Sequence, residues 1–316
     1  MLKPAASSRI APAPYLDDIA EGPEGARAWW LSARDGTRIR FCVFPKGEKG
    51  TVLMCPGRTE YIEKYGRLAS ELAARGYGMA AIDWRGQGLA DRPAHRRDMG
   101  HVVSFDEYRW DLDAVRMAFD DLDLRHPDFL IGHSMGGAIG LRALYDGLPV
   151  RAAAFTAPMW GIRIAPALRA LTPVILGLAG PLGFGKSFAP TTGPAKPMDF
   201  DDNPLTTDRD QFDYMIRQVA THPELALGGP STTWLKAALA ENRALMAMPA
   251  PDVPVLTVIG SREKIVETSA IHDRMATWPG GALMEVAGAE HEVLMEAPLR
   301  RSAVIDRICA HFDRHA

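Results

Sequence analysis

An apolar run that ends in a serine flanked by glycines is the first feature of this sequence that could do chemistry. Residues 129–138 read FLIGHSMGGA, so Ser134 occupies the centre of a G-x-S-x-G pattern. The apolar residues before it predict a strand, and the small residues after it predict a helix that packs closely on that strand. A serine in such a strand-to-helix turn exposes its hydroxyl above the sheet. We therefore predict that Ser134 is a nucleophile.

A serine hydroxyl is a weak nucleophile at neutral pH, so it needs a histidine base that an acid holds in place. In proteins with this turn, the acid and then the histidine follow the serine along the chain. His291 follows the last predicted strand, and Glu263 follows the strand predicted at Val255–Ile259. Asp252 and Asp273 are rivals for the acid, but one precedes that strand and the other lies well inside the next helix. We expect His291 as the base and Glu263 as the acid.

Other histidines fit the role of base less well. His133 lies inside the turn, where we expect it to pack beside the nucleophile. His101 lies in a segment with no clear assignment, and a structural hydrogen bond is its favoured role. His311 and His315 fall on a predicted terminal helix, where we expect solvated side chains.

The tetrahedral intermediate of acyl transfer needs backbone N–H groups that bind its oxyanion. One should come from Met135, directly after the nucleophile. The other should come from the loop 56–59, where the N–H of Arg58 is the best candidate. The guanidinium of Arg58 has two interpretations, since it could meet an anionic group or pair with Glu60. Of these we favour the structural ion pair.

Short apolar runs alternate with helix-like segments along the chain. Strands are predicted at 28–33, 38–44, 51–55, 78–83, 129–132, 152–156, 255–259 and 283–286, and an Asp-Gly hairpin turn separates the first two. Most of these runs are continuously apolar, which is typical of strands covered on both faces. Helices are predicted at Tyr65–Arg75, after a capping box of Ser104 and Glu107, and from about Pro298 onward. The alternation predicts an α/β fold, with a mostly parallel eight-stranded sheet and helices on both faces.

The segment 159–248 breaks this alternation. It holds many prolines and glycines and no clear strand, so we expect a helical insertion rather than a bare loop. Its first part, 159–198, contains no Asp or Glu but carries the cations Arg163, Arg169, Lys186 and Lys196. Residues 1–26 are rich in Pro, Ala and Ser, and we expect a loose lead-in there, followed by a single domain over 27–316.

Composition excludes several classes of protein. The chain has 316 residues, a net charge of −3 and no basic cluster interleaved with aromatic residues, so nucleic acid is not an expected partner. Cys42, Cys55 and Cys309 lie far apart, which favours buried free thiols and a reducing compartment. We find neither a signal peptide nor an apolar run long enough to span a bilayer. We therefore expect a cytoplasmic protein, with peripheral contact to the inner face of the membrane as a further option.

Together these segments resemble the α/β-hydrolase superfamily and, more narrowly, its lysophospholipase and monoacylglycerol lipase family, which includes serine aminopeptidase-like hydrolases. The resemblance covers roughly residues 28–315. The segments that carry it are 55–65, 82–92, 100–112, 131–139, 203–212, 227–235 and 288–298. One departure concerns the acid, because the family usually has Asp where this chain has Glu263.

The resemblance implies a cap at 159–248, Ser134 as nucleophile, His291 as base, and oxyanion donors at Arg58 and Met135. It implies hydrolysis of a carboxylic ester in a small-molecule lipid, with no metal or organic cofactor. The apolar, cationic part of the insertion could also meet the membrane or a phosphate headgroup, although an ordinary helical cap explains the same composition.

Several alternatives stay open at this point. One group comprises other serine hydrolases on this scaffold, namely a carboxylesterase, thioesterase, acyltransferase or peptidase. Another is a non-catalytic binding protein with a relic triad. A serine nucleophile disfavours dehalogenases and epoxide hydrolases, which need a carboxylate at that position.

Overall fold

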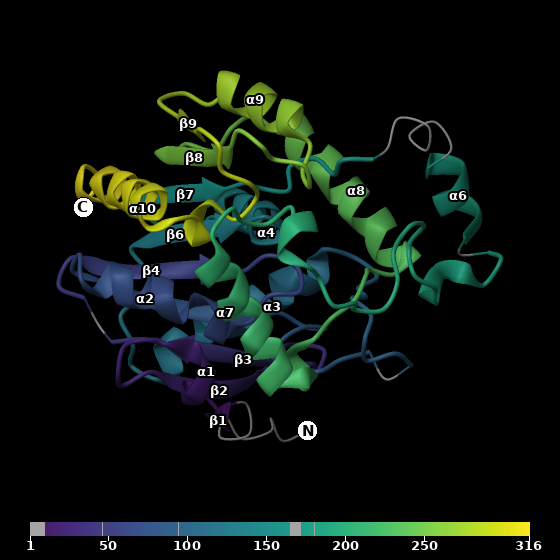
Figure 1. The fold of residues 1–316 in the computed structure, drawn as a ribbon, viewed down its shortest axis with the longest axis horizontal. Helices are drawn as coiled ribbons and strands as arrows, with labels where there is room; N and C mark the ends of the chain where they lie inside the picture. The colour runs from purple at the N-terminus through teal and green to yellow at the C-terminus, as the bar shows by residue number, and fades with distance from the viewer. Residues whose placement is uncertain (1–9, 46, 94, 165–171, 180) are drawn as a thin grey trace, which may run out of the picture.

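The computed structural model describes residues 10–45, 47–93, 95–164, 172–179 and 181–316 (Figure 1). Within these residues nine strands form one sheet in the order β1-β2-β3-β5-β4-β6-β7-β8-β9. The strands are β1 (Ile10–Ala13), β2 (Arg27–Ser32), β3 (Arg38–Val43), β4 (Gly50–Cys55), β5 (Tyr77–Asp83), β6 (Phe129–His133), β7 (Ala152–Thr156), β8 (Val255–Gly260) and β9 (Ala282–Val286). All eight predicted strands are present, each with bounds within one residue of the prediction. The predicted α/β fold is confirmed, with β1 as an additional strand.

Two kinds of pairing divide the sheet. Strands β1, β2, β3 and β5 pair antiparallel, whereas β5, β4, β6, β7, β8 and β9 pair parallel. The parallel strands β4 to β8 are buried along their whole length, because helices cover both faces of the sheet. Their carboxyl ends therefore meet at one edge, which is where ligands collect in open α/β sheets.

The N-terminal segment is more ordered than we predicted. Strand β1 pairs with the edge strand β2, and helix α1 (Asp17–Ala20) follows it. Ile19 and Ala20 of this helix are buried, and the ring of Tyr15 packs edge-on against Phe44, with ring centroids 5.7 Å apart. The prediction of a loose lead-in is therefore wrong for residues 10–26, because β1 pairs the otherwise open backbone of β2. Residues 1–9 of the predicted lead-in lie outside the described residues.

Helices cover the two faces of the sheet. Helices α2 (Gly66–Ala73) and α10 (Pro298–Asp313) pack on one face, whereas α3 (Asp106–Asp121), α4 (Met135–Tyr145) and α9 (Thr268–Ala276) pack on the other. The helix predicted at 65–75 is divided into a short 3-10 helix, η2 (Ile62–Tyr65), and α2. One of the two hydrogen bonds of the predicted capping box is present, namely the one from the N–H of Ser104 to Oε1 of Glu107, at 3.1 Å.

Helix α10 begins at Pro298, as predicted, but one expectation about its histidines is wrong. His311 is buried rather than solvated, since its side chain turns toward the sheet and packs beside Phe312. Burial lowers the pKa of His311 to about 4. The helical pattern around His311 did not reveal which face of α10 the sheet would cover.

The insertion between β7 and β8 is helical in its described part. Its elements are α6 (Thr172–Ala179), η3 (Phe184–Lys186), η4 (Phe200–Asp202), α7 (Arg209–Thr221), η5 (Pro223–Leu225) and α8 (Thr232–Ala247). Figure 1 shows α6 at the outer edge of the molecule, beyond α8. In contrast, α7 is tied to the core, because the hydroxyl of Tyr214 donates to the carbonyls of Ala20 and Glu63 at 2.6 and 2.9 Å. None of the described helices is both long and apolar enough to cross a bilayer.

A buried ion pair network joins three elements under α7. Arg40 of β3 contacts Asp83 of β5 and Glu63 of η2, each at 2.7 Å, and all of these side chains are fully buried. Asp83 also accepts the N–H of Ile62 at 2.9 Å. This network holds η2, which follows the loop after β4, against the sheet. The cysteines Cys42, Cys55 and Cys309 are free and buried, as predicted.

Candidate active site

The G-x-S-x-G segment forms a sharp turn between β6 and α4. Ser134 has φ 50° and ψ −117°, a conformation that residues other than glycine rarely adopt. Its N–H donates to the carbonyl of Thr156 at 3.0 Å, so the neighbouring strand holds the strained residue in place. A side chain at Gly136 would collide with the carbonyl oxygen of Cys55, and one at Gly132 would lie only 2.8 Å from the Gly136 oxygen. The glycines are thus required for this turn.

Glu263 and His291 are brought together by the strands β8 and β9. Nδ1 of His291 lies 2.6 Å from Oε2 of Glu263, and the two side chains are 4% and 1% exposed. The other carboxylate oxygen accepts the N–H groups of Ile265 and Val266 at 2.5 and 3.0 Å. Burial acts to raise the pKa of Glu263, but the contact with His291 and these N–H donors lower it below its usual value. The carboxylate is therefore ionised at neutral pH and can orient the imidazole.

The rival acids do not lie in comparable positions. Asp252 and Asp273 are exposed, one before β8 and the other on α9. Glu263 instead lies in a tight turn directly after β8, where its N–H donates to the carbonyl of Gly260 at 3.2 Å. This turn keeps the longer glutamate side chain close to the end of its strand, within reach of the imidazole.

The imidazole of His291 lies beside the turn that carries Ser134. Its ring packs against that of His133, the residue directly before Ser134, with ring centroids 4.9 Å apart. The insertion supports the backbone next to His291, because the N–H of Glu292 donates to the carbonyl of Leu205 at 2.8 Å. The imidazole is thus held between the turn and the insertion.

Two backbone donors lie at the ends of adjacent strands. Strands β4 and β6 pair directly, and Arg58 follows the first while Met135 follows the second. Within the described part of the chain, no protein acceptor is found for the N–H of Arg58 or Met135. Met135 is the first residue of α4, where N–H groups have no partner inside the helix. Unpaired N–H groups beside a nucleophile are the donors that an oxyanion requires.

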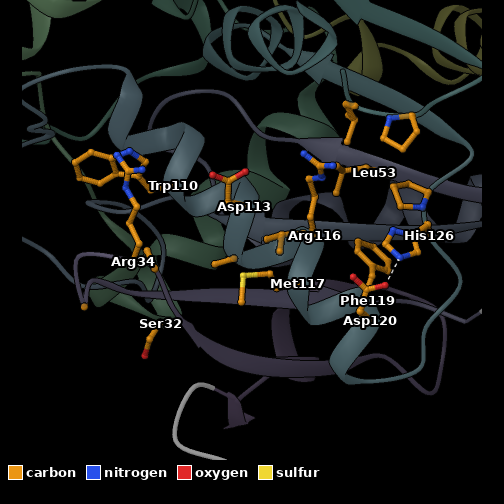
Figure 2. A pocket seen from close by; sticks show the side chains of 17 residues that line it. Ser32, Arg34, Leu53, Trp110, Asp113, Arg116, Met117, Phe119, Asp120 and His126 are labelled. Carbon is orange, nitrogen blue, oxygen red and sulfur yellow. Dashed lines mark hydrogen bonds and ion pairs between the residues drawn. The ribbon is translucent and has the colours of Figure 1, made fainter. Parts of the chain in front are cut away.

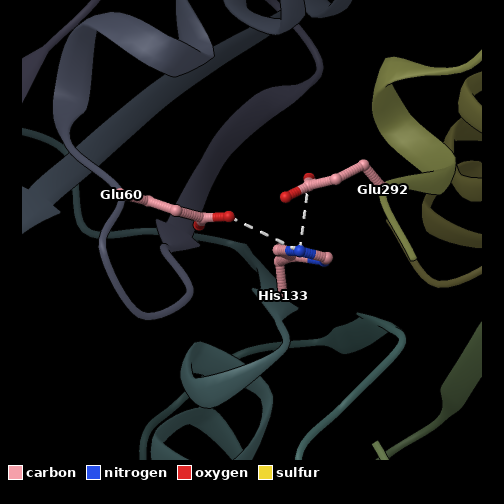
Figure 3. A group of neighbouring side chains, drawn as sticks. All are labelled: Glu60, His133 and Glu292. Atoms are coloured by element: carbon pink, nitrogen blue, oxygen red, sulfur yellow. Dashed lines mark ion pairs between the residues drawn. The ribbon is translucent and has the colours of Figure 1, made fainter. Parts of the chain in front are cut away.

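A cluster of buried charged side chains joins the loops around this site. Figure 3 shows three of its members, Glu60, His133 and Glu292, which converge from separate segments. The fourth member is Lys64, whose Nζ lies 2.5 Å from Glu60 Oε1 and 2.6 Å from Glu292 Oε1. Nε2 of His133 lies 3.2 Å from Glu292 Oε2 and 3.5 Å from Glu60 Oε1, which are ion-pair distances. We call these four residues the buried charge cluster.

Acidic and basic side chains face one another in the buried charge cluster. Burial acts to lower the pKa of His133, but the carboxylates of Glu292 and Glu60 raise it above its ordinary value. Burial likewise acts to raise the pKa of Glu292, but His133 and Lys64 hold it well below its usual range. Ligand atoms of Glu60, His133 and Glu292 lie within 4.8 Å of one another, a spacing that would suit a metal ion. The ammonium of Lys64 already supplies the positive charge between the two carboxylates.

Sequence reasoning missed three members of the buried charge cluster as site components. The sequence could have indicated each of them, because each lies within a few residues of a predicted site residue. Glu60 and Lys64 are spaced i, i+4 directly after the Arg58 loop, and Glu292 follows His291. His133, which was expected to pack beside Ser134, packs against the ring of His291.

Two predicted side-chain roles have different outcomes. The favoured pairing of Arg58 with Glu60 is wrong, because Glu60 binds Lys64, the hydroxyl of Tyr65 at 2.5 Å and the N–H of Gly57. The guanidinium of Arg58 instead donates to a carbonyl of the insertion. The structural role predicted for His101 is confirmed by a 2.7 Å contact of its Nδ1 with Ser231 Oγ.

Two hollows on the described residues lie away from Ser134, Glu263 and His291. Figure 2 shows the larger, of about 670 Å³, which has Arg34 and Trp110 at one end and the hydrogen-bonded pair of His126 and Asp120 at the other. The second, of about 550 Å³, lies between the start of α3, α6 and α8. Neither is lined by Ser134, Glu263 or His291, so neither is assigned to the chemistry.

The outer part of the insertion carries both apolar and cationic side chains. Arg163, Lys186 and Lys196 are exposed, whereas Arg169 lies outside the described residues. Large apolar side chains are also exposed there, namely Val174, Ile175, Leu178, Leu182 and Phe184. We call these exposed residues the outer insertion surface.

Comparison with curated proteins gives relatives along most of the chain. The sequence is 32% identical over 292 residues to lysophospholipase L2 of Escherichia coli strain K12, covering 89% of this chain and 86% of that protein. It is 27% identical over 260 residues to probable lysophospholipase L2 of Haemophilus influenzae, covering 81% and 82%.

Solved structures show the same fold. A soluble variant of monoglyceride lipase from Saccharomyces cerevisiae, in complex with a substrate analogue, superposes with a TM-score of 0.72 at 20% identity, over 97% of this chain and 99% of that one. Paleococcus ferrophilus monoacylglycerol lipase superposes with a TM-score of 0.65 at 21% identity, over 87% and 98%. Residues 46–298 match the family described as serine aminopeptidase, S33. The protein belongs to this family of serine hydrolases and has the α/β-hydrolase fold.

Proposed function

We propose that the protein cleaves the acyl ester of a lysophospholipid, or of a monoacylglycerol, through an acyl-enzyme on Ser134. The observation that carries the proposal is the buried hydrogen bond between Glu263 and His291, beside the strained turn at Ser134. An ionised carboxylate, an imidazole and a serine in this order form the machinery of acyl transfer. The lipid substrate is supported by the lysophospholipase names of the curated relatives.

In the proposed mechanism, Oγ of Ser134 attacks the ester carbonyl carbon while His291 accepts the hydroxyl proton. Glu263 stabilises the resulting imidazolium. The N–H groups of Arg58 and Met135 bind the oxyanion of the tetrahedral intermediate. The glycerol oxygen then leaves and takes the proton from His291. Finally, water attacks the acyl-enzyme with the same imidazole as base, and the fatty acid departs.

The insertion 159–248 acts in this proposal as the cap over the acyl chain, within a hydrolase domain that includes residues 10–316. The contact between the N–H of Glu292 and the carbonyl of Leu205 supports this role, because it joins the insertion to the loop of the catalytic base. The outer insertion surface would then make peripheral contact with the inner face of the membrane, where lipid esters reside. Buried free thiols are compatible with a cytoplasmic setting.

Fatty-acid release from a panel of esters tests the proposal. The panel contains lysophospholipids, monoacylglycerols and short p-nitrophenyl esters, with Ser134→Ala as the inactive control. We expect turnover of the long-chain lipid esters and labelling of Ser134 by a fluorophosphonate probe. Turnover of peptides or thioesters alone would contradict the proposed substrate class. Failure of the folded wild-type protein to label would contradict an activated serine.

A further inference from the structure

The guanidinium of Arg58 contacts no carboxylate, unlike those of Arg40 and Arg85, and in this it resembles the buried Arg274, which donates to the carbonyls of Met248 and Leu245. Arg40 pairs with two carboxylates, and Arg85 contacts Asp111 and Asp35, each at 2.7 Å. Among the described residues, no carboxylate pairs with Arg58. Buried or partly buried cations usually have an anionic partner, because an unpaired charge is costly to remove from water.

Arg92 is an arginine whose Nη1 and Nη2 are both bound by backbone carbonyls, although no partner is found among the described residues for its buried Nε. It also lacks a carboxylate, but it donates to the carbonyls of Gly88, Glu224, Leu225, Ala226 and Arg97, at 2.8 to 3.4 Å. A guanidinium has five N–H donors in a planar fork. In the described part of the chain, Arg58 uses its Nη1 for the carbonyl of Gly228 at 2.8 Å, and no other protein acceptor is found for it. Arg58 therefore retains donors for a ligand.

The surroundings of Arg58 are neutral. A β-carbon at Gly100 would lie 3.8 Å from Nη1 of Arg58, and the phenol of Tyr108 is close enough to interact with the guanidinium electrostatically. Burial lowers the pKa of Arg58 to about 10, so the group is still charged at neutral pH. Arg58 remains partly accessible. A partly accessible cation with free donors in a neutral setting is suited to bind a phosphate, which accepts bidentate hydrogen bonds from arginine.

The position of Arg58 in the chain sets which phosphate it could reach. Its own N–H is one proposed donor to the oxyanion, so its side chain begins beside the reacting carbonyl. In a lysophospholipid, the glycerol unit alone separates the acyl ester from the phosphate. The side chain of Arg58 and this glycerol unit are of similar length, so one residue could contact both ends.

We propose that the guanidinium of Arg58 binds the phosphate of a lysophospholipid headgroup and so determines preference for lysophospholipids over monoacylglycerols. This inference rests on the proposed function and names a specificity-determining residue for it.

The test compares two substrates with the same acyl chain, 1-palmitoyl-glycerophosphoethanolamine and 1-monopalmitoylglycerol, in the same detergent micelles. The measured quantity is the ratio of their kcat/KM values. Any disturbance of the backbone donor at Arg58 affects both substrates and cancels in this ratio. We expect the ratio to fall about 10- to 100-fold in Arg58→Gln, since a charge-assisted hydrogen bond is lost. Arg58→Lys should retain part of the preference, and the control Arg217→Gln, at an exposed position on α7, should retain all of it.

Equal losses on both substrates would overturn the inference, because a purely structural arginine would affect them alike. If Arg58→Gln does not fold, ether-linked analogues of the two lipids decide the question on the Ser134→Ala protein. We expect the analogue with the phosphate to bind more tightly, and equal binding would overturn the inference. If the wild-type protein hydrolyses neither ester, the proposed function fails, while the ether pair still decides whether a phosphate site exists.

Discussion

Glu292 Oε2 lies 3.2 Å from Nε2 of His133, and each residue is the direct neighbour of a proposed catalytic residue. Glu292 follows His291, and His133 precedes Ser134. The contact therefore joins the loop of the proposed base to the turn of the proposed nucleophile. Lys64 contacts both Glu292 and Glu60, and so links this pair to the loop of the proposed oxyanion donor Arg58.

We predict that Glu292→Gln lowers kcat about 10-fold or more and leaves KM within about twofold, because the positions of His291 and Ser134 loosen while substrate contacts persist. The variant should also lose about 3–5 kcal/mol of unfolding free energy, since Lys64 and His133 lose a buried counter-charge. Steady-state kinetics and urea denaturation measure both effects. Glu285→Gln, an exposed change on β9, is the matched control. A normal kcat in Glu292→Gln would assign the buried charge cluster to stability alone.

Substitutions in the proposed triad should separate the nucleophile and base from the acid. We expect Ser134→Ala and His291→Ala each to lower kcat by about 10⁶-fold, and Glu263→Gln by about 10⁴-fold. Combining Ser134→Ala with Glu263→Gln should cost little more than Ser134→Ala, because the residues act as a unit. Hydrolysis of a p-nitrophenyl ester measures these rates. A Glu263→Gln enzyme of near-normal rate would move the acid elsewhere.

The raised pKa of His133 predicts how stability depends on pH. Its ordinary value is 6.5, and the carboxylates of Glu292 and Glu60 raise it in the folded protein. A group with a raised pKa contributes stability that is complete below 6.5 and is lost as pH rises through the folded value. Urea denaturation at a series of pH values from 6.5 upward should show this loss of unfolding free energy. His133→Gln should reduce the slope of unfolding free energy against pH. His272→Gln, at an exposed position, should preserve it. Identical slopes in all three proteins would contradict a charged His133.

The buried ion pairs of Arg40 with Glu63 and Asp83 should contribute more to the unfolding free energy than exposed ion pairs do. We expect Arg40→Ala to lower the unfolding free energy by about 3–5 kcal/mol, because it leaves Glu63 and Asp83 buried without a counter-charge. Arg38→Ala removes an exposed ion pair with Asp91, whose side chains are 49% and 46% exposed, and should cost at most about 1 kcal/mol. Denaturant unfolding compares the two variants. Similar losses would argue against the network as the stronger anchor.

Membrane contact through the outer insertion surface is testable with vesicles. Replacing Arg163, Lys186 and Lys196 with Gln should weaken binding to anionic vesicles, since each cation near the surface contributes about 1 kcal/mol. Added salt should weaken wild-type binding in the same direction. Co-sedimentation measures the bound fraction. Unchanged binding of the triple variant would leave the insertion with a packing role only.

The sequence alone determined the features that depend on short stretches of chain. Apolar runs located the strands of the sheet, because a buried strand needs apolar residues on both faces over a few positions. The turn at Ser134 was predictable because the apolar run, the G-x-S-x-G pattern and the small residues after it all lie within one short segment. The order of Ser134, Glu263 and His291 followed from the strands that precede them.

Tertiary structure decided the features that depend on which distant segments meet. β1 joined the sheet because β2 offered an open edge, and its own composition did not indicate a strand. Arg58 bonded to Gly228 rather than Glu60 because Lys64, the hydroxyl of Tyr65 and the N–H of Gly57 already bind Glu60. Ion pairs inside a protein depend on distances between segments that are far apart in the sequence. Glu60 and Glu292 come close enough to share Lys64 only when the sheet assembles.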